Sequence, residues 1–381
     1  MNRSRTTLRA LRVATAIAVL AIWDAGPMDA AAQTDYSRIA TIQIPGSPLA
    51  SFGTSWVDQV RQQYLLTDRS NRSLAVISTD TNTFAFQVPG FSGVSTGTAT
   101  AGPNGVTTVA HRYAWVGDGN SEIKVVDLKT RAIVDRISTG GTSRVNQLCH
   151  DPRDHLVMAA NDFDTPPFVT FISTEGNHRI LGRLTFPNAT NQLQQGALQY
   201  CAWWAKTGLF YLTVPEAQGR VFTGEVAVID PRTRTLANTF PVSNESSGLA
   251  IGPNGQAMVG GTGSSGIFII DLTNGSTVAS FPLFDTDQVW YDPGAGLYFS
   301  TSEPSPGPGF TPELVVFKAN PPTQEQNLPV GVYDHSLAAD SETNQLYVAT
   351  SAVLSTVCSN GCISVYADSS SGGQQQAAGG Q

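Results

Sequence analysis

The chain carries the segments Glu122-Ile-Lys-Val-Val126 and Glu225-Val-Ala-Val-Ile229, which continue into the turns Asp127-Leu-Lys-Thr130 and Asp230-Pro-Arg-Thr233. Short runs of apolar and β-branched residues that end in turn residues are typical of β-strands. Five further segments have the same form: Ser73-Leu-Ala-Val-Ile77, Phe168-Val-Thr-Phe-Ile172, Gly266-Ile-Phe-Ile-Ile270, Glu313-Leu-Val-Val-Phe317 and Cys362-Ile-Ser-Val-Tyr366. The pattern therefore recurs seven times along the sequence.

A second marker gives the length of the repeating unit. The first strand of each unit ends, in the same register, at Asp58, Val109, Asp151, Trp204, Gly252, Asp292 and Asp340. Six intervals separate Asp58 from Asp340, so each unit is about 47 residues long. Units of about 40 to 50 residues with several strands each are typical of propeller blades. The sequence predicts an all-β fold, a seven-bladed β-propeller within residues 33–368.

The two ends of this domain predict how the ring closes. Residues 36–44 alternate like a strand but precede the first complete unit, whereas the seventh unit ends after its third strand, at residues 362–368. An open sheet edge is a liability that a closed ring removes. We therefore expect the N-terminal strand to pair with residues 362–368 and complete the last blade.

The termini and the charge predict an exported protein. Four arginines precede the apolar run Val13–Trp23, and small residues follow it, which is typical of a secretory signal peptide over residues 1–32. The run is too short to span a bilayer. Removal of residues 1–32 takes the formal charge from −8 to −10, which argues against nucleic acid and anionic membranes as partners. We expect a periplasmic or secreted monomer whose residues 369–381 form a disordered tail.

The four cysteines allow disulfides in an exported protein. Asn360-Gly361 is a hairpin turn signal that would bring Cys358 and Cys362 together, so a bridge is predicted there. Cys149 and Cys201 fall one position apart in the repeat register. A second bridge and two buried thiols therefore both remain open for them.

Several units resemble the exported bacterial seven-bladed propellers of the YncE-like, YVTN-repeat kind. The resemblance rests on Gly102-Pro-Asn-Gly-Val106, Ala114-Trp-Val-Gly-Asp-Gly-Asn120 with Ile123–Leu128, and Val226–Thr233, and it extends over residues 36–368. It implies the fold and export. It does not imply one activity, because related propellers include binding proteins, lactonases and lyases. Where such propellers often present histidine at the start of a blade, this chain has Ser246-Ser-Gly248.

The repeat register also predicts which residues face the central channel. Five positions before each strand-end marker stand Gly53, Asn104, Asn146, Gln199, Ser247, Asp287 and His335. An inner strand packed between blades is normally apolar, so six polar side chains at this position are unexpected from packing alone. A ligand site and a polar lining of a water-filled channel both explain them.

The second strands end on the face where the first strands begin, and polar residues follow several of them. These are Asp68, Arg69, Asp118, Asp162, Glu216 and Glu303. Together with the ring they predict an acidic mouth that would suit a divalent cation such as Ca²⁺, a cationic ligand or a polyhydroxylated molecule. Asn104, Asn146 and Asp287 are the candidate metal ligands, an arrangement that loosely resembles the calcium-centred funnel of gluconolactonase-type propellers.

Two functions follow from this arrangement. The leading hypothesis is an exported binding or scaffold propeller that engages a small ligand or a protein partner at its funnel face. The alternative is a metal-assisted lactonase, hydrolase or lyase, in which His335 beside Asp334 would transfer protons. His111 and His150 are expected on the opposite face.

Overall fold

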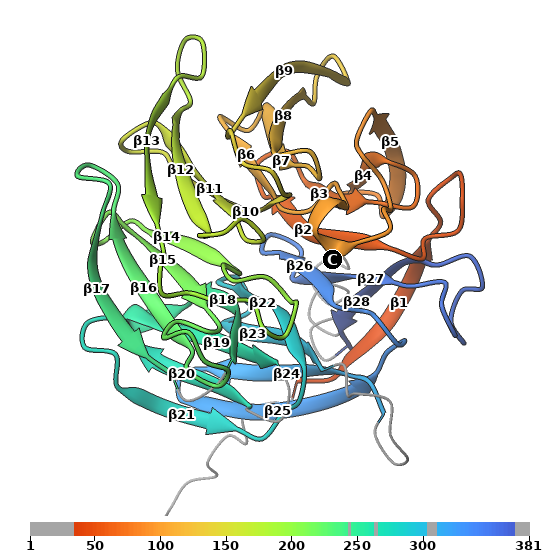
Figure 1. Ribbon diagram of the computed structural model, residues 1–381. Coiled ribbons are helices and arrows are strands. Elements are labelled where there is room, and N and C mark those ends of the chain that lie inside the picture. Colours follow the sequence, from red (N-terminus) through yellow and green to blue (C-terminus); the bar gives the residue numbers. More distant parts are fainter. Residues whose placement is uncertain (1–33, 243–244, 263–265, 303–310, 370–381) are drawn as a thin grey trace, which may run out of the picture. The chain divides into compact units, whose positions relative to one another are not determined.

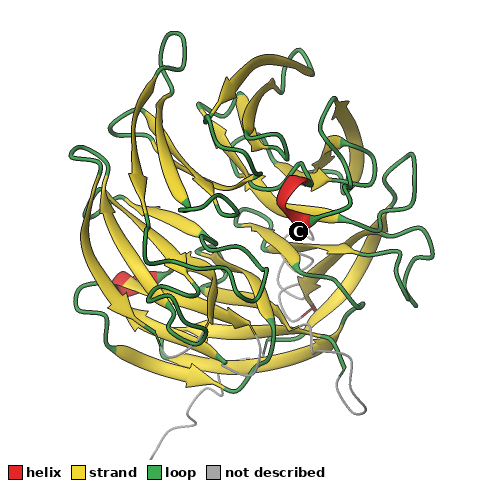
Figure 2. Ribbon diagram, in the orientation of Figure 1, coloured by secondary structure: helices red, strands yellow, loops and turns green. Residues whose placement is uncertain are grey.

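The structure, a computed structural model, describes residues 34–242, 245–262, 266–302 and 311–369. These described residues all belong to one compact unit. Within them, 28 strands form seven four-stranded antiparallel sheets arranged in a ring, which confirms the predicted seven-bladed propeller (Figure 1). Two 3₁₀ turns, η1 (Thr98–Thr100) and η2 (Pro253–Gly255), stand out against the strands in Figure 2.

In blades 1 to 6 the strands follow one another in the chain from the channel outward, whereas the outermost strand of blade 7 comes from the N-terminal end of the domain. Blades 1 to 3 are β2 (Phe52–Asp58), β3 (Gln63–Asp68), β4 (Ser73–Ser78), β5 (Thr83–Pro89); β6 (Val106–Val109), β7 (Tyr113–Gly117), β8 (Glu122–Asp127), β9 (Ala132–Ser138); and β10 (Val145–Asp151), β11 (Leu156–Asn161), β12 (Phe168–Ser173), β13 (Ile180–Thr185). Blades 4 and 5 are β14 (Cys201–Trp204), β15 (Leu209–Val214), β16 (Glu225–Asp230), β17 (Thr235–Pro241); and β18 (Glu245–Ile251), β19 (Gln256–Thr262), β20 (Ile267–Asp271), β21 (Thr277–Phe281). Blades 6 and 7 are β22 (Thr286–Asp292), β23 (Leu297–Ser302), β24 (Glu313–Ala319), β25 (Pro322–Pro329); and β26 (Ser336–Asp340), β27 (Gln345–Thr350), β28 (Cys362–Asp368), with β1 (Tyr36–Ile42) outermost.

The core lies between the blades. Third strands such as β4 and β8 are buried on both faces, which explains their nearly continuous apolar sequence. Outer strands such as β9 alternate between inward and outward side chains and are more exposed. In the described residues the buried apolar side chains form seven clusters, one at each interface between neighbouring blades.

The aspartates that mark the repeat cap turns. Asp151 Oδ1 accepts hydrogen bonds from the backbone N–H groups of Arg153 (2.9 Å) and Asp154 (3.1 Å). Asp127, which ends a third strand, accepts in the same way from Lys129 N at 2.8 Å. A short carboxylate that bonds the backbone two residues onward is the reason why aspartate favours such turns.

The N-terminal strand closes the ring. Strand β1 pairs antiparallel with β28, from Tyr36 opposite Asp368 to Ile42 opposite Ile363, as the sequence predicts (Figure 1). Tyr36 is only 1% exposed and packs on Phe299 of blade 6. The first and last strands are therefore held in one sheet.

Two predicted segments, residues 1–32 and most of the tail from 370, lie outside the described residues. None of the helices in the part of the chain that the structure describes is long and apolar enough to cross a membrane.

Candidate functional site

Six of the seven ring residues line one cavity of about 670 Å³ at the face where the inner strands begin. They come from six blades: Gly53, Asn146, Gln199, Ser247, Asp287 and His335. Asn104 does not line this cavity, but its neighbour Arg69 does. The cavity is referred to below as the funnel cavity.

Irregular backbone at the start of the inner strands orients these residues. The pairing of β2, β10, β18 and β22 with the second strand is interrupted at the ring positions, for example between Val145 and Leu148. Such β-bulges bend a strand and redirect side chains, and they are frequent beside functional sites. Backbone groups near the ring positions bond to the next blade: Thr54 N donates to Asn104 O (3.0 Å), and Gly105 N donates to Asn146 O (2.6 Å).

Part of the ring's polarity serves the fold. Asn146 Nδ2 donates to Leu198 O of the next blade (3.4 Å), and Ser247 Oγ donates to Thr286 O. Gln288 connects blade 6 to blade 1, because its Nε2 donates to Ser55 O at 2.9 Å. Hydrogen bonds between blades therefore account for part of the polar ring.

The carboxylates that the sequence predicted at an acidic mouth are, where the structure describes them, buried and bound to protein groups. Asp68, Asp118, Asp162 and Glu216 are at most 2% exposed, and none of them lines the funnel cavity. Asp68 binds the side chain of Asn71, Asp118 binds Lys124, and Asp162 binds Arg144. Glu216 accepts hydrogen bonds from Thr190 Oγ1 (2.6 Å) and from Gln192 N (2.8 Å). These side chains order the loops of the funnel face, and Glu303 lies outside the described residues.

Two arginines line the cavity, of which the sequence predicted only Arg69. Arg69 donates from Nη2 to Asn104 Oδ1 (2.8 Å) and from Nε to Pro103 O (3.2 Å). Burial, and then the neighbouring Arg144, lower the pKa of Arg69 to about 9. At neutral pH it therefore still carries a positive charge.

Arg144 differs from Arg69 because its charge has a protein counter-ion. Its Nη2 lies 2.6 Å from Asp162 Oδ2 and its Nε lies 3.2 Å from Asp162 Oδ1, and its guanidinium lies over the ring of Phe163. Burial raises the pKa of Asp162, and Arg144 opposes that rise. The sequence does carry a signal for Arg144, which the predicted site did not include: it is a cationic residue directly before the inner strand of blade 3.

Asp285, Asp287 and Tyr200 also line the cavity. Burial, and then the Asp287 carboxylate, raise the pKa of Tyr200 well above its ordinary value. Tyr200 therefore stays a neutral hydroxyl group at physiological pH. The cavity thus combines cationic, anionic and amide side chains.

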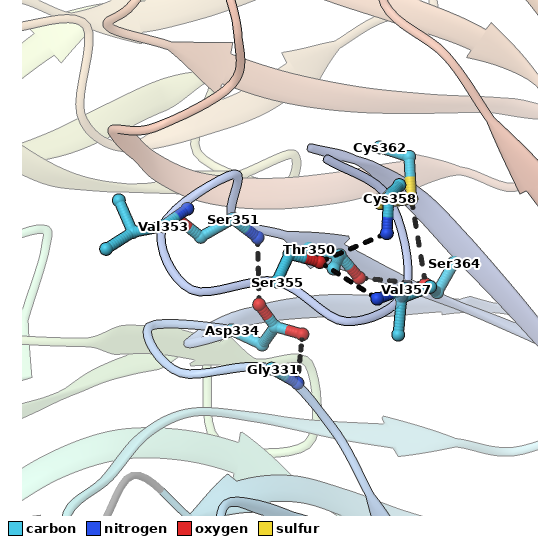
Figure 3. Close-up of a disulfide and its surroundings, with 10 residues drawn as sticks. All are labelled: Gly331, Asp334, Thr350, Ser351, Val353, Ser355, Val357, Cys358, Cys362 and Ser364. Carbon is cyan, nitrogen blue, oxygen red and sulfur yellow. Dashed lines mark hydrogen bonds between the residues drawn. A yellow bond between two sulfur atoms is a disulfide. The ribbon is translucent and has the colours of Figure 1, made fainter. Parts of the chain in front are cut away.

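His335 lines the funnel cavity, where its ring stacks on Phe52 with centroids 4.6 Å apart. Its Nδ1 lies 3.0 Å from Tyr333 O, a contact that favours the tautomer with the proton on Nδ1. The adjacent Asp334 accepts hydrogen bonds from Gly331 N and Ser351 N, both at 2.8 Å (Figure 3). Asp334 therefore orders two loops of blade 7.

The candidate metal ligands are engaged by protein groups. Asn104 Oδ1 accepts from the Arg69 guanidinium, which would place a positive charge beside any bound cation. Asn146 and Asp287 line the cavity on other blades. Among the described residues no cluster of three or more His, Cys, Asp or Glu side chains could hold a metal ion. Of the three candidates, Asn104 is poorly placed to bind a cation, because its side-chain oxygen already accepts from Arg69.

A second cavity, of about 840 Å³, opens on the opposite face. Trp56, Trp203 and Trp290 line it together with His111, His150 and His155. Thr54, Gln147 and Tyr200 contribute to both cavities, so the two share their central wall. Burial, then His155 and His111, lower the pKa of His150 to about 4.

Both cysteine pairs are disulfides. Cys358–Cys362 closes the predicted small loop next to the turn that contains Ser355 and Val357 (Figure 3). Cys149–Cys201, which the sequence left open, crosslinks the inner strands β10 and β14, with Cα atoms 6.0 Å apart.

Comparisons with known proteins support the fold and do not identify a family. No family model and no curated protein matches the sequence. The chain is similar to a chain of a solved structure entitled "Crystal Structure of Mitotic Checkpoint Complex", with a TM-score of 0.64 and 14% identity over 95% of this chain and 98% of that chain. In all, 1507 chains of solved structures match, so a fold of this kind does not select one function.

Proposed function

We propose that this protein is an exported binding propeller of the YncE-like kind and that it holds a small polar ligand in the funnel cavity. The observation that carries the proposal is the convergence of side chains from six blades on one cavity. Its volume of about 670 Å³ lies within the range of small-molecule sites. A concave site of this size favours a small ligand over a protein partner.

Export is supported by the two disulfides, since such bonds persist in oxidising compartments. The proposal expects a mature chain that begins at about Gln33. Intact-mass measurement of protein recovered from the periplasm or the medium tests this, and a chain that retains residues 1–32 in solution would contradict it.

The binding role is tested with a panel of small sugars, organic acids, amines and amides, scored by thermal shift and then by calorimetry. The variants Asp287→Ala and His335→Ala remove polar cavity groups, and thermal melting of each variant establishes that it is folded, since His335 also stacks on Phe52. For compounds that stabilise the wild type, we expect each variant to bind with an affinity lower by roughly tenfold or more. Asp80→Ala and His155→Ala, which change side chains outside the funnel cavity, are the matched controls.

Two results would overturn the proposal. The first is a panel without any compound that stabilises the wild type, or with compounds whose binding both cavity variants retain in full. The second is turnover of a bound compound that His335→Ala abolishes, because this would assign the funnel to an enzyme.

A further inference from the structure

Lys124 and Arg144, the two buried cations among the described residues, both have carboxylate partners. The Lys124 side chain is 4% exposed and pairs with Asp118, and the Arg144 side chain is 6% exposed and pairs with Asp162. Proteins pair buried charges in this way because an unpaired charge loses its hydration without compensation.

Arg69, which is half-buried at the funnel cavity, has no such partner in the described part of the chain. Within the described residues, its hydrogen bonds go to the neutral oxygens of Pro103 and Asn104. These bonds use Nε and Nη2, whereas a guanidinium has five N–H groups. Arg69 therefore lines the cavity with donors to spare and without a carboxylate in contact.

The electrostatic surroundings agree with this geometry. Arg144 lies close enough to lower the pKa of Arg69, whereas Asp287, Tyr200 and Asp162 act in the opposite direction. An anion that entered the cavity would offset the repulsion between the two guanidinium groups. A guanidinium matches the two oxygens of a carboxylate or phosphate group.

We propose that the funnel cavity recognises a small organic oxyanion, with Arg69 supplying the counter-charge and Asn104 fixing the orientation of its guanidinium. The remainder of the ligand carries hydroxyl or amino groups, because Asp285, Asp287 and the amides of Gln195 and Gln199 line the cavity beside it. This inference rests on the proposed function, since it names the class of ligand for the same cavity.

The test uses compounds of matched size that differ in charge. The probes form three sets, each with one anionic member named first. The sets are glucuronate with glucose and glucosamine, succinate with succinamide, and glycerol 3-phosphate with glycerol. Each is titrated into the full mature protein at low salt, so that screening does not mask the charge effect. The variants are Arg69→Gln, Arg69→Lys and, as a control, Arg61→Gln, which changes an arginine outside this cavity.

We expect wild type and Arg61→Gln to prefer the anionic member of at least one set. Arg69→Gln should lower the affinity for that anion roughly 10- to 100-fold. Arg69→Lys should lose less affinity, because lysine keeps the positive charge although it lacks the planar guanidinium. The carboxylate and phosphate probes distinguish the two sources of the oxyanion. Circular dichroism and melting of each variant establish that it is folded.

The inference fails if neutral or amino compounds bind as well as the anions, or if folded Arg69→Gln keeps the preference for anions. If neutral compounds bind and Asp287→Ala abolishes that binding, the proposed function stands, but the inference that the ligand is an anion is refuted. Absence of binding by every probe would contradict both.

Discussion

Nη2 of Arg69, at the end of the second strand of blade 1, lies 2.8 Å from Oδ1 of Asn104, which precedes the inner strand of blade 2. Asn104 is fully buried, and its Nδ2 donates to Ala101 O at 2.8 Å and to Val145 O, the first residue of the inner strand of blade 3, at 3.3 Å. One amide thus ties the guanidinium to two further blades.

Asn104→Ala should release Arg69 and leave buried polar groups without partners. We expect a loss of about 1–3 kcal/mol in the free energy of unfolding and weaker binding of anions by the folded variant. Urea denaturation and calorimetry measure the two effects. Asn120→Ala, at an exposed position, is the control, and equal behaviour of the two variants would contradict this role.

The two disulfides should contribute unequally to stability. Cys149–Cys201 spans 52 residues and Cys358–Cys362 spans 4. The chain-entropy estimate assigns about 4 kcal/mol to the longer loop and less than about 3 kcal/mol to the shorter one. Denaturation of Cys149→Ala/Cys201→Ala and of Cys358→Ala/Cys362→Ala compares them, and an equal or reversed order would contradict the assignment.

Closure of the ring depends on the inward face of β1. Tyr36→Ala should cost roughly 3–5 kcal/mol, because a large buried side chain at the interface of blades 6 and 7 is lost. Ile39→Ala alters the same strand at a side chain that is 50% exposed, and it should cost below about 1 kcal/mol. Similar melting temperatures for the two variants would show that β1 contributes little to closure.

His150 predicts a loss of stability in weak acid. Its folded pKa of about 4 lies below its ordinary value of 6.5, so between these pH values the unfolded chain binds a proton that the folded protein excludes. Stability should therefore fall as pH decreases from about 6.5 to 4, by at most about 3 kcal/mol from this group. Above pH 6.5 the group should have no effect.

Comparison of wild type with His150→Gln from pH 8 to 4 isolates this contribution, because the variant cannot titrate there. The difference in unfolding free energy between the two proteins should change with pH only below about 6.5. Parallel profiles would contradict the assignment.

The repeat made the fold predictable from sequence, because each unit carries its own strand and turn residues. Asp58 and Asp340 mark equivalent turns, so the register between them also placed Gln199 and Asp287 at one face. The unpaired edge of residues 362–368 predicted the closing strand for the same reason.

The acidic loop residues were harder to place, because their partners are distant in sequence or lie in irregular loops. The sequence around Asp162 shows a polar surface loop, yet Arg144, 18 residues earlier, holds it inside the protein. The pairing of Cys149 with Cys201 likewise depends on how close two inner strands lie, which the register alone does not specify.

The most direct test is a crystal structure of the mature protein with the anion that stabilises it most. The account predicts density for the ligand in the funnel cavity, with its oxyanion within hydrogen-bonding distance of the Arg69 guanidinium. Ligand density only in the opposite cavity, beside Trp56 and Trp290, or only on the outer surface, would contradict it.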